Sequence, residues 1–150
     1  MKNFILIISI IFLTSCGYSA VYKQQEKSDI QITLEATSGN NTINNLIKSK
    51  IKKYNSNSVK NNFNISVNSN FTKTVLSRDT TGKASDFKLN LIVEFTVRFE
   101  DNIKYFIFEE NLNIENSSDT YEQNNYENSI KNNFVNSIIE KLILKLILLK

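Results

Sequence analysis

The chain has 150 residues, with 18 Lys and Arg against 15 Asp and Glu, no His, no Pro and a single Cys. This nearly neutral charge excludes the strongly basic surface that is typical of nucleic-acid-binding proteins. One cysteine cannot form an intramolecular disulfide, so packing must stabilise the folded core.

The chain opens with a short positive segment, Met1 to Asn3, and an apolar run, Phe4 to Phe12. The run is too short to span a bilayer, and the arrangement is typical of a secretory signal peptide. Leu13-Thr14-Ser15-Cys16 follows directly and places the cysteine where a bacterial lipoprotein is cleaved and lipidated. We predict that residues 1–15 are removed and that Cys16 carries a diacylglycerol on sulfur and an acyl chain on its freed amine, which anchor it durably to a membrane. The alternative is an ordinary signal peptide followed by a chance cysteine.

Gly17 follows the cysteine, at a position where Asp would favour retention in the inner membrane of a Gram-negative cell. We therefore expect the protein on the periplasmic face of the outer membrane. Residues 16–28 show no periodicity and are predicted to be a lipidated N-terminus and tether. Removing 15 of the 150 residues leaves 135, the size of one ordinary domain, and we expect residues 29–150 to form it.

The first structured elements are predicted to be a strand and a helix. Ile30, Ile32 and Leu34 alternate with polar residues, which is the period of a half-buried strand. From Thr42 to Tyr54 the period becomes helical, and the apolar residues form a stripe along one face of the predicted helix. Two interpretations fit the basic residues beside this apolar stripe: a solvated helix face, or a surface for membranes or lipid phosphates. These residues are Lys48, Lys50, Lys52 and Lys53.

Two long strands follow, joined by a polar turn. Apolar residues occupy most odd positions from Phe63 to Val75 and every odd position from Phe87 to Phe99. This alternation predicts an antiparallel hairpin with one dry face, and Arg78 to Lys83 form its tip. Glu100-Asp101-Asn102 then predicts a tight turn into another strand.

That next strand runs from Ile103 to Ile114, and its apolar phase shifts near Tyr105-Phe106. The shift predicts either a β-bulge or a strand packed on both faces.

A long helix is predicted to close the fold. Asp119 and Glu122 have the spacing of a capping box, and apolar residues continue at helical intervals. The pattern gives the order strand, helix, three strands, helix in two layers. The segment Leu142 to Leu149 is apolar nearly all round, so it either inserts into a partner or a lipid surface or forms a well-buried helix end. The predicted stripe consists of Tyr126, Ile130, Phe134, Ile138 and Leu142.

The Cys16-Gly17-Tyr18 start, the hairpin arm Ala84 to Val93, the element order and the closing helix together resemble the LptE family. Its members are lipopolysaccharide-assembly lipoproteins of the outer membrane. The resemblance implies an α+β fold, a two-layer sandwich with two helices on one face of a mixed four-stranded sheet, order β-α-β-β-β-α. It also implies a plug inside the large β-barrel LptD, with a role in assembling that barrel and in passing lipopolysaccharide to the cell surface.

The resemblance suggests a lipopolysaccharide contact at the hairpin tip. Arg78 falls close to the family's basic tip position and Lys83 lies on the same loop, and both side chains can make charge-assisted hydrogen bonds to phosphate. Solvated loop residues are the plain alternative. The family's other basic position, near the start of the last helix, has no counterpart here because residues 117–128 contain no Lys or Arg.

Enzymatic activity is not expected. The chain has no histidine, and its one cysteine is assigned to lipid, so no nucleophile with a base, no catalytic residue, no metal site and no cofactor is predicted. Carboxylates on the last strand, Glu109, Glu110 and Glu115, have no evident converging partner. The remaining alternative is a scaffold or accessory lipoprotein of another envelope machine.

Overall fold

The computed structural model describes residues 30–55 and 61–149. The predicted signal peptide (1–15), the lipidation site Cys16 and the predicted tether (16–28) lie outside the described residues.

Six elements make up the described chain. Strand β1 is followed by a short helix, three further strands and a long helix, and this order confirms the sequence prediction. They are β1 (Ile30–Gly39), α2 (Asn41–Ile51), β2 (Asn61–Arg78), β3 (Ala84–Phe99), β4 (Asn102–Glu115) and α3 (Thr120–Ile147).

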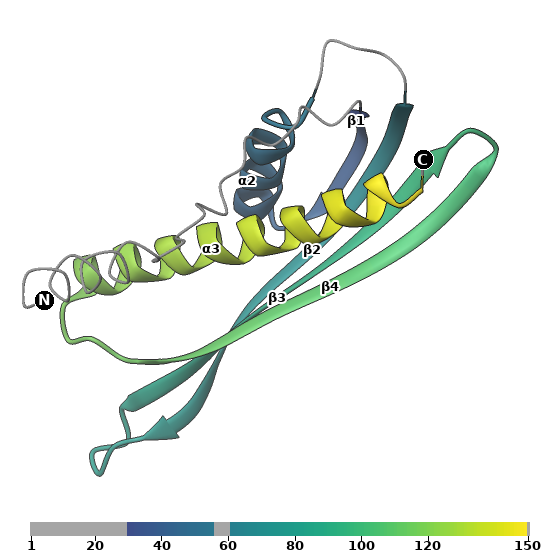
Figure 1. The fold of residues 1–150 in the computed structure, drawn as a ribbon. Helices are drawn as coiled ribbons and strands as arrows, with labels where there is room; N and C mark the ends of the chain where they lie inside the picture. The colour runs from purple at the N-terminus through teal and green to yellow at the C-terminus, as the bar shows by residue number, and fades with distance from the viewer. Residues whose placement is uncertain (1–29, 56–60, 150) are drawn as a thin grey trace, which may run out of the picture.

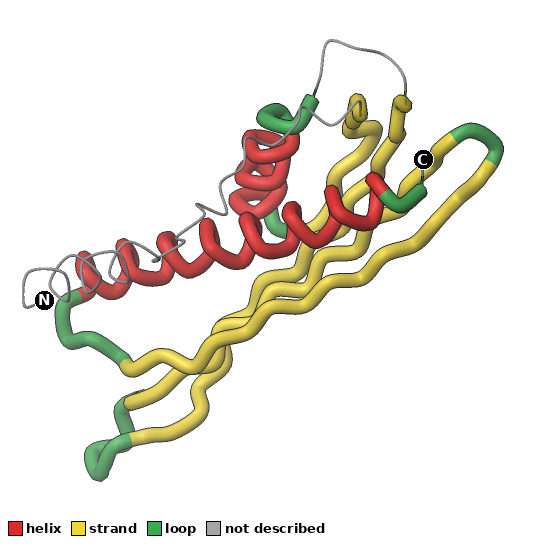
Figure 2. The backbone as a smooth tube through the Cα atoms, viewed as in Figure 1, coloured by secondary structure: helices red, strands yellow, loops and turns green. Residues whose placement is uncertain are grey.

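The four strands form one mixed sheet in the order β1-β2-β3-β4. β1 pairs with β2 in parallel, and the other neighbours are antiparallel. Both helices lie on the same face of this sheet, with α3 running along most of its length (Figures 1 and 2). The fold is therefore the predicted α+β two-layer sandwich.

A polar N-cap residue precedes each helix. The Asn40 side chain accepts a hydrogen bond from the Ile43 backbone N–H, and the Asp119 carboxylate accepts from the N–H groups of Tyr121 and Glu122. These bonds satisfy backbone donors that have no partner inside the helix. Asp119 is thus the N-cap that the sequence predicts, whereas α2 ends at Ile51, earlier than the predicted Tyr54.

The core lies between the inner sheet face and the two helices. It contains alternate residues of every strand and one side of each helix, which is why the period-2 and helical patterns in the sequence agree with the structure. Its largest fully buried side chains are Phe63, Phe95, Ile30, Ile43, Ile47, Ile65, Leu89, Leu91, Ile138, Ile139, Leu142 and Leu146.

The predicted irregularity at Tyr105-Phe106 is absent, because β3 and β4 pair without a register shift from Asp86 opposite Glu115 to Phe99 opposite Asn102. The alternative prediction, a strand packed on both faces, is also wrong. Tyr105 is 72% exposed on the outer face, although it lies in an apolar run. The bulges occur instead in β1, between Leu34 and Ala36, and near the end of β2, between Val75 and Arg78.

The stripe predicted for α3 is correct except at its first member. Tyr126 is 52% exposed, and its neighbour Glu127 is buried in its place. The apolar C-terminal segment is divided: Leu142, Ile143 and Leu146 are buried, while Leu144, Ile147 and Leu148 are exposed. Among the described residues, no helix combines the length and hydropathy required to cross a membrane.

Candidate functional site at the hairpin tip

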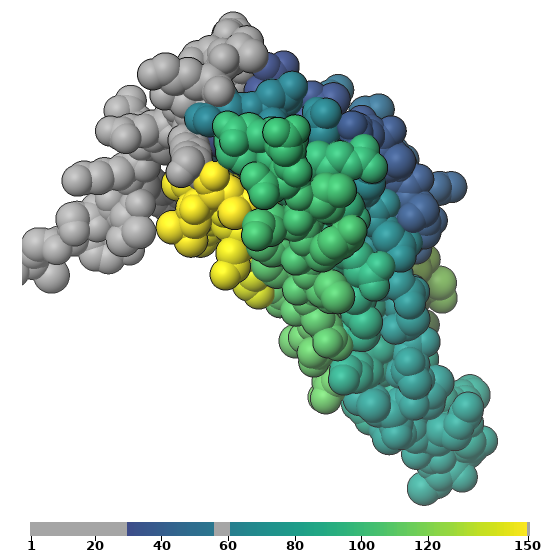
Figure 3. Space-filling view, turned by 90° about the vertical axis from the view of Figure 1, so that its right-hand side faces the viewer, coloured from purple at the N-terminus to yellow at the C-terminus, as the bar shows by residue number. Residues whose placement is uncertain are grey.

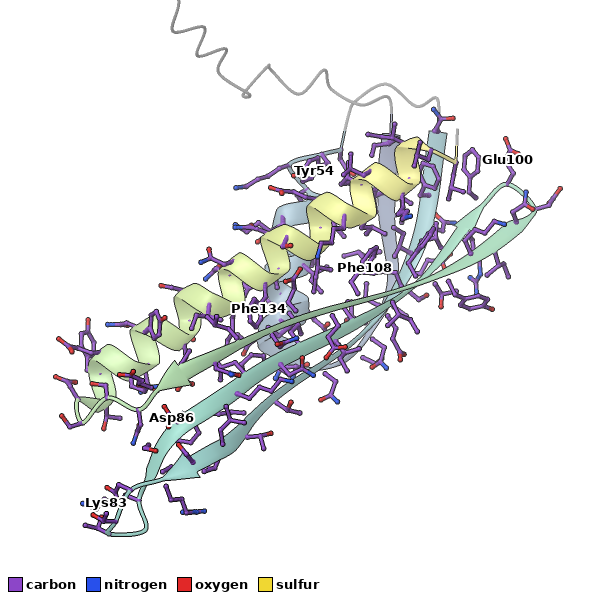
Figure 4. All side chains as sticks on the ribbon, turned by 60° about the horizontal axis from the view of Figure 1, so that its bottom comes forward. Tyr54, Lys83, Asp86, Glu100, Phe108 and Phe134 are labelled. Carbon is purple, nitrogen blue, oxygen red and sulfur yellow. The ribbon has the colours of Figure 1, made fainter. Side chains whose placement is uncertain are left out.

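The β2–β3 hairpin ends in a polar turn, residues 78–83, which we call the tip. It projects at the end of the sheet opposite the β3–β4 turn, beyond the start of α3 (Figures 1 and 4). Arg78 is the last residue of β2, and Lys83 directly precedes β3; both side chains are exposed. The structure therefore brings the two residues of the predicted lipopolysaccharide site to one turn.

Asp79 organises this turn. Its Oδ1 accepts hydrogen bonds from the Thr81 hydroxyl at 2.7 Å and from the backbone N–H groups of Thr81 and Lys83 at 2.8 and 3.0 Å. The bond from the Thr81 hydroxyl, together with the backbone bonds, lowers the pKa of Asp79 because each stabilises the charged form. Gly82 completes the turn with a φ of 84°, a conformation that strongly favours glycine.

Arg78 is partly engaged by the same turn. Its Nη1 donates a hydrogen bond to the Gly82 carbonyl at 2.9 Å. A guanidinium has five N–H donors, so this bond leaves donors for a ligand while holding the side chain against the tip. The guanidinium of Arg78 thus has a defined position with free donors, and Lys83 contributes a second exposed positive charge beside it.

A hollow of 530 Å³ lies beside the tip, between β3 and the end of β4. Three of its lining residues, Asp79, Asp86 and Glu115, are acidic, and only Lys83 is basic. Asp86 Oδ2 accepts hydrogen bonds from the hydroxyls of Ser77 and Ser85, and these bonds lower the pKa of Asp86. The hollow does not suit an anion, so a phosphate would have to meet the basic side chains on the exposed side of the tip.

A polar chain that the sequence analysis missed connects the hairpin to α3. Glu127 Oε1 accepts hydrogen bonds from Lys73 Nζ at 2.5 Å and from Gln123 Nε2 at 2.8 Å, and Gln123 Oε1 accepts from the Ser117 N–H at 2.9 Å. Lys73 Nζ also lies 4.0 Å from the centre of the Phe87 ring. The only sequence signals were a lysine at an inward position of β2 and a glutamate beside the apolar stripe of α3.

Burial alone would raise the pKa of Glu127, but the hydrogen bonds from Lys73 and Gln123 outweigh it and the pKa is lowered. Glu110 on β4 behaves similarly: burial raises its pKa, and the stronger combined effect of Lys141 and Ser137 lowers it. Both carboxylates therefore favour the charged form, and each forms an ion pair that joins the sheet to α3.

The start of α3 presents no positive charge to a ligand. Its first basic residue is Lys131, and the ammonium group lies 5.0 Å from the centre of the Phe71 ring and 3.4 Å from Asn128 Oδ1. This arrangement agrees with the missing second basic position in the sequence.

The carboxylates of β4 do not converge. Glu110 faces α3, where Lys141 and Ser137 donate to its Oε1, whereas its neighbour Glu109 projects from the opposite face of the strand. Within residues 30–55 and 61–149, no three potential metal ligands of the His, Cys, Asp or Glu type come together.

The outer sheet face is largely polar. β2 and β3 present Asn, Ser, Thr and charged side chains there, with hydrogen bonds such as Asn68 Nδ2 to Glu94 Oε2 at 3.1 Å. The exception is an apolar strip at the edge on β4: Ile103, Tyr105 and Ile107, which are 49%, 72% and 68% exposed.

The fold is similar to two solved bacterial structures. Rare lipoprotein B from Shewanella oneidensis matches with a TM-score of 0.57 and 15% identity, over 79% of this chain and 98% of that one. A "putative lipoprotein" from Caulobacter crescentus matches with a TM-score of 0.52 and 11% identity, over 81% and 89%. No protein-family model and no curated protein matches the sequence. At these identities the likeness shows a shared fold alone.

Proposed function

We propose that this protein is an outer-membrane lipoprotein, acylated at Cys16, that supports assembly of a lipopolysaccharide-translocating β-barrel of the LptD type and helps deliver lipopolysaccharide to the outer leaflet. One observation carries the proposal: the fold shared with two bacterial lipoproteins follows a lipoprotein cleavage sequence in the same chain. The proposed role requires no enzymatic activity and no cofactor.

The outer sheet face supports a barrel partner. The interiors of large outer-membrane barrels are polar, so a plug needs a mainly polar surface, as β2 and β3 provide. The strip Ile103, Tyr105 and Ile107 offers a local apolar contact at the edge of that face. We assign this combined surface to the contact with the inner wall of the barrel.

The tip is the proposed lipopolysaccharide contact. Arg78 and Lys83 are two exposed positive charges on a turn that Asp79 holds together, and the phosphates of lipopolysaccharide accept charge-assisted hydrogen bonds from such groups. The contact has one basic cluster, because the start of α3 supplies no second one.

A pull-down with lipopolysaccharide tests the tip. Arg78→Glu with Lys83→Glu should reduce the recovered lipopolysaccharide strongly, while the melting temperature stays near that of the parent. Lys88→Glu with Lys104→Glu is the matched control, since it reverses two charges away from the tip. Equal recovery with the tip variant would overturn the assignment.

Co-purification after detergent extraction tests the barrel partner. We expect a large outer-membrane barrel to accompany the full-length protein, and Tyr105→Glu with Ile107→Glu to reduce its recovery. Thr72→Glu with Thr74→Glu provides a control, because it adds the same charge to exposed positions of β2 on the same face. Recovery of the monomer alone would contradict the barrel role.

The second candidate function is a scaffold or accessory lipoprotein of another envelope machine, because the same fold and anchor suit it equally. Depletion separates the two. Loss of the proposed protein should leave a misassembled large barrel and lipopolysaccharide stranded in the periplasm, whereas an accessory of another machine would spare both.

A further inference from the structure

The C-terminal turns of α3 expose more apolar surface than the core requires. Leu144 and Leu148 lie one helical turn apart on the side away from the sheet and are 63% and 78% exposed, and Ile147 is 40% exposed. Leu142, Ile143 and Leu146 already cover the core on the other side of the helix. The outer leucines therefore have no packing role within the described residues.

Lysines cluster at the same end of the molecule. Lys145 lies between the exposed leucines on α3, and four more lysines occupy the last turns of α2 and the residues after it. Lysines in the last turn of a helix compensate the negative end of the helix dipole, which accounts for Lys48 and Lys50. This reason does not extend to Lys52 and Lys53, because they follow the helix. The four are Lys48, Lys50, Lys52 and Lys53.

Hydrogen bonds fix where the lysines of α2 lie. Asn55 Oδ1 accepts from the Ile32 N–H at 2.9 Å, and Asn55 Nδ2 donates to the Ile32 carbonyl at 3.1 Å. The end of α2 is thus held against the start of β1. α3 also ends at this end of the sheet, with its yellow C-terminus next to the green β3–β4 turn in Figure 3.

Acidic residues at this end lie mainly on the sheet side. Glu100 and Asp101 occupy the β3–β4 turn, and Glu140 is the exposed acid on the last turns of α3. Figure 4 places Glu100 and Tyr54 on opposite sides of the C-terminal end of α3. The surface formed by Leu144, Leu148, Lys145, Lys52 and Lys53, which we call the helix-end surface, is therefore basic and apolar together.

The start of the described chain bears on what covers this surface. β1 begins at Ile30 at this end, and Ile30 follows the proposed lipid anchor Cys16 by 14 residues. A segment of that length spans at most about 45–50 Å. Tethering at such a distance gives the domain an effective concentration of about millimolar at the membrane. A surface of the domain with only weak intrinsic affinity for lipid would therefore still be bound to the membrane most of the time.

We propose that the helix-end surface rests on the anionic lipid headgroups of the membrane in which Cys16 is anchored, with Leu144 and Leu148 entering the boundary between headgroups and acyl chains. This inference rests on the proposed acylation of Cys16. Apolar side chains flanked by lysines are the chemistry that binds an anionic lipid surface. The contact leaves the hairpin tip free, because the tip lies at the opposite end of the sheet (Figure 1).

A fluorescent probe on the full-length lipidated protein tests the contact. Leu148→Cys supplies a free thiol for an environment-sensitive dye, since an acylated Cys16 does not react. In vesicles of phosphatidylethanolamine and phosphatidylglycerol, we expect a blue shift, quenching by lipid-attached quencher and protection from iodide. Probes at Thr81→Cys in the tip and at Tyr121→Cys, which lies at the other end of α3, should stay open to iodide.

Charge reversal separates a lipid contact from burial in the protein itself. Lys52→Glu with Lys53→Glu in the Leu148→Cys protein should weaken docking by about tenfold or more and restore iodide quenching, without changing the melting temperature. Thr72→Glu with Lys88→Glu, which adds negative charge to the outer face of β2 and β3 away from this end, should leave the probe docked.

Three results would overturn the proposal. An acylated chain whose Leu148 probe remains fully open to iodide in vesicles would overturn the membrane contact and leave the lipoprotein assignment intact. A chain whose N-terminal peptide has the mass of an unacylated Cys16 would overturn both. Protection from iodide and from the lipid quencher together, in the purified barrel complex, would place a protein on this surface instead.

Discussion

Lys73 of β2 donates a hydrogen bond to Glu127 of α3 across the inner face of the sheet, with Nζ and Oε1 2.5 Å apart. The two residues are 54 positions apart in the sequence. Glu127 is only 8% exposed, and Gln123 is the second donor to the same oxygen. This pair joins the strand that leads to the tip to the first half of α3, where the apolar core has ended.

Lys73→Met should lower the free energy of unfolding by about 1–3 kcal/mol, because it leaves a largely buried carboxylate without its cation. Urea denaturation measures the change. Lys88→Met, at an outer-face position of β3, serves as the control and should have little effect. Equal stability of Lys73→Met and the parent would contradict a stabilising role for the pair.

Stability should fall on acidification through Glu110 and Glu127. Both pKa values are lowered from an ordinary value of 4.5 in the folded state, so the stabilisation is present above about pH 4.5 and is lost as the pH falls through the folded-state values. Melting temperatures measured between pH 7 and pH 3 should show this decline. In the double variant Glu110→Gln with Glu127→Gln, the decline should be shallower. An unchanged slope would exclude these two groups as its cause.

Gly39→Ala should be strongly destabilising. Gly39 ends β1 with a φ of 88°, and a Cβ there would lie 1.9 Å from the Ser69 carbonyl oxygen, which accepts a hydrogen bond from the Asn40 N–H. We expect a loss of about 2 kcal/mol or more in the free energy of unfolding. Gly82→Ala is a matched control: its φ is 84°, but a Cβ would meet nothing within 4 Å, so only the conformational cost of about 1 kcal/mol applies. Similar losses in both variants would contradict the clash.

Asp79→Ala should loosen the tip without unfolding the protein. The change removes the acceptor for the N–H groups of Thr81 and Lys83, so their amide hydrogens should exchange with solvent faster. Hydrogen exchange followed by mass spectrometry measures this, with Asp101→Ala in the β3–β4 turn as the control. Unaltered exchange at the tip would show that Asp79 does not organise the turn.

Much of the fold was predictable because it depends on local periodicity. The alternation from Phe87 to Phe99 requires one buried and one wet face whatever lies above it, and Asp119 caps its own helix through neighbouring backbone groups. The position of Arg78 and Lys83 on one turn followed from the same hairpin. The bulge or two-faced packing predicted near Tyr105 is wrong, because the apolar residues that shift the phase, such as Tyr105, project from the outer face of a regularly paired strand into solvent.

The sequence alone determined the order of the elements, the dry faces of the strands and the basic tip, because each depends on residues close together in the chain. Tertiary structure decided which oppositely charged residues meet and which apolar residues remain outside. Glu127 is buried because Lys73 and Gln123 reach the same oxygen. Leu148 remains exposed because one side of α3 is enough to cover the sheet. Both outcomes depend on how a helix lies across strands from distant parts of the chain, which no local pattern contains.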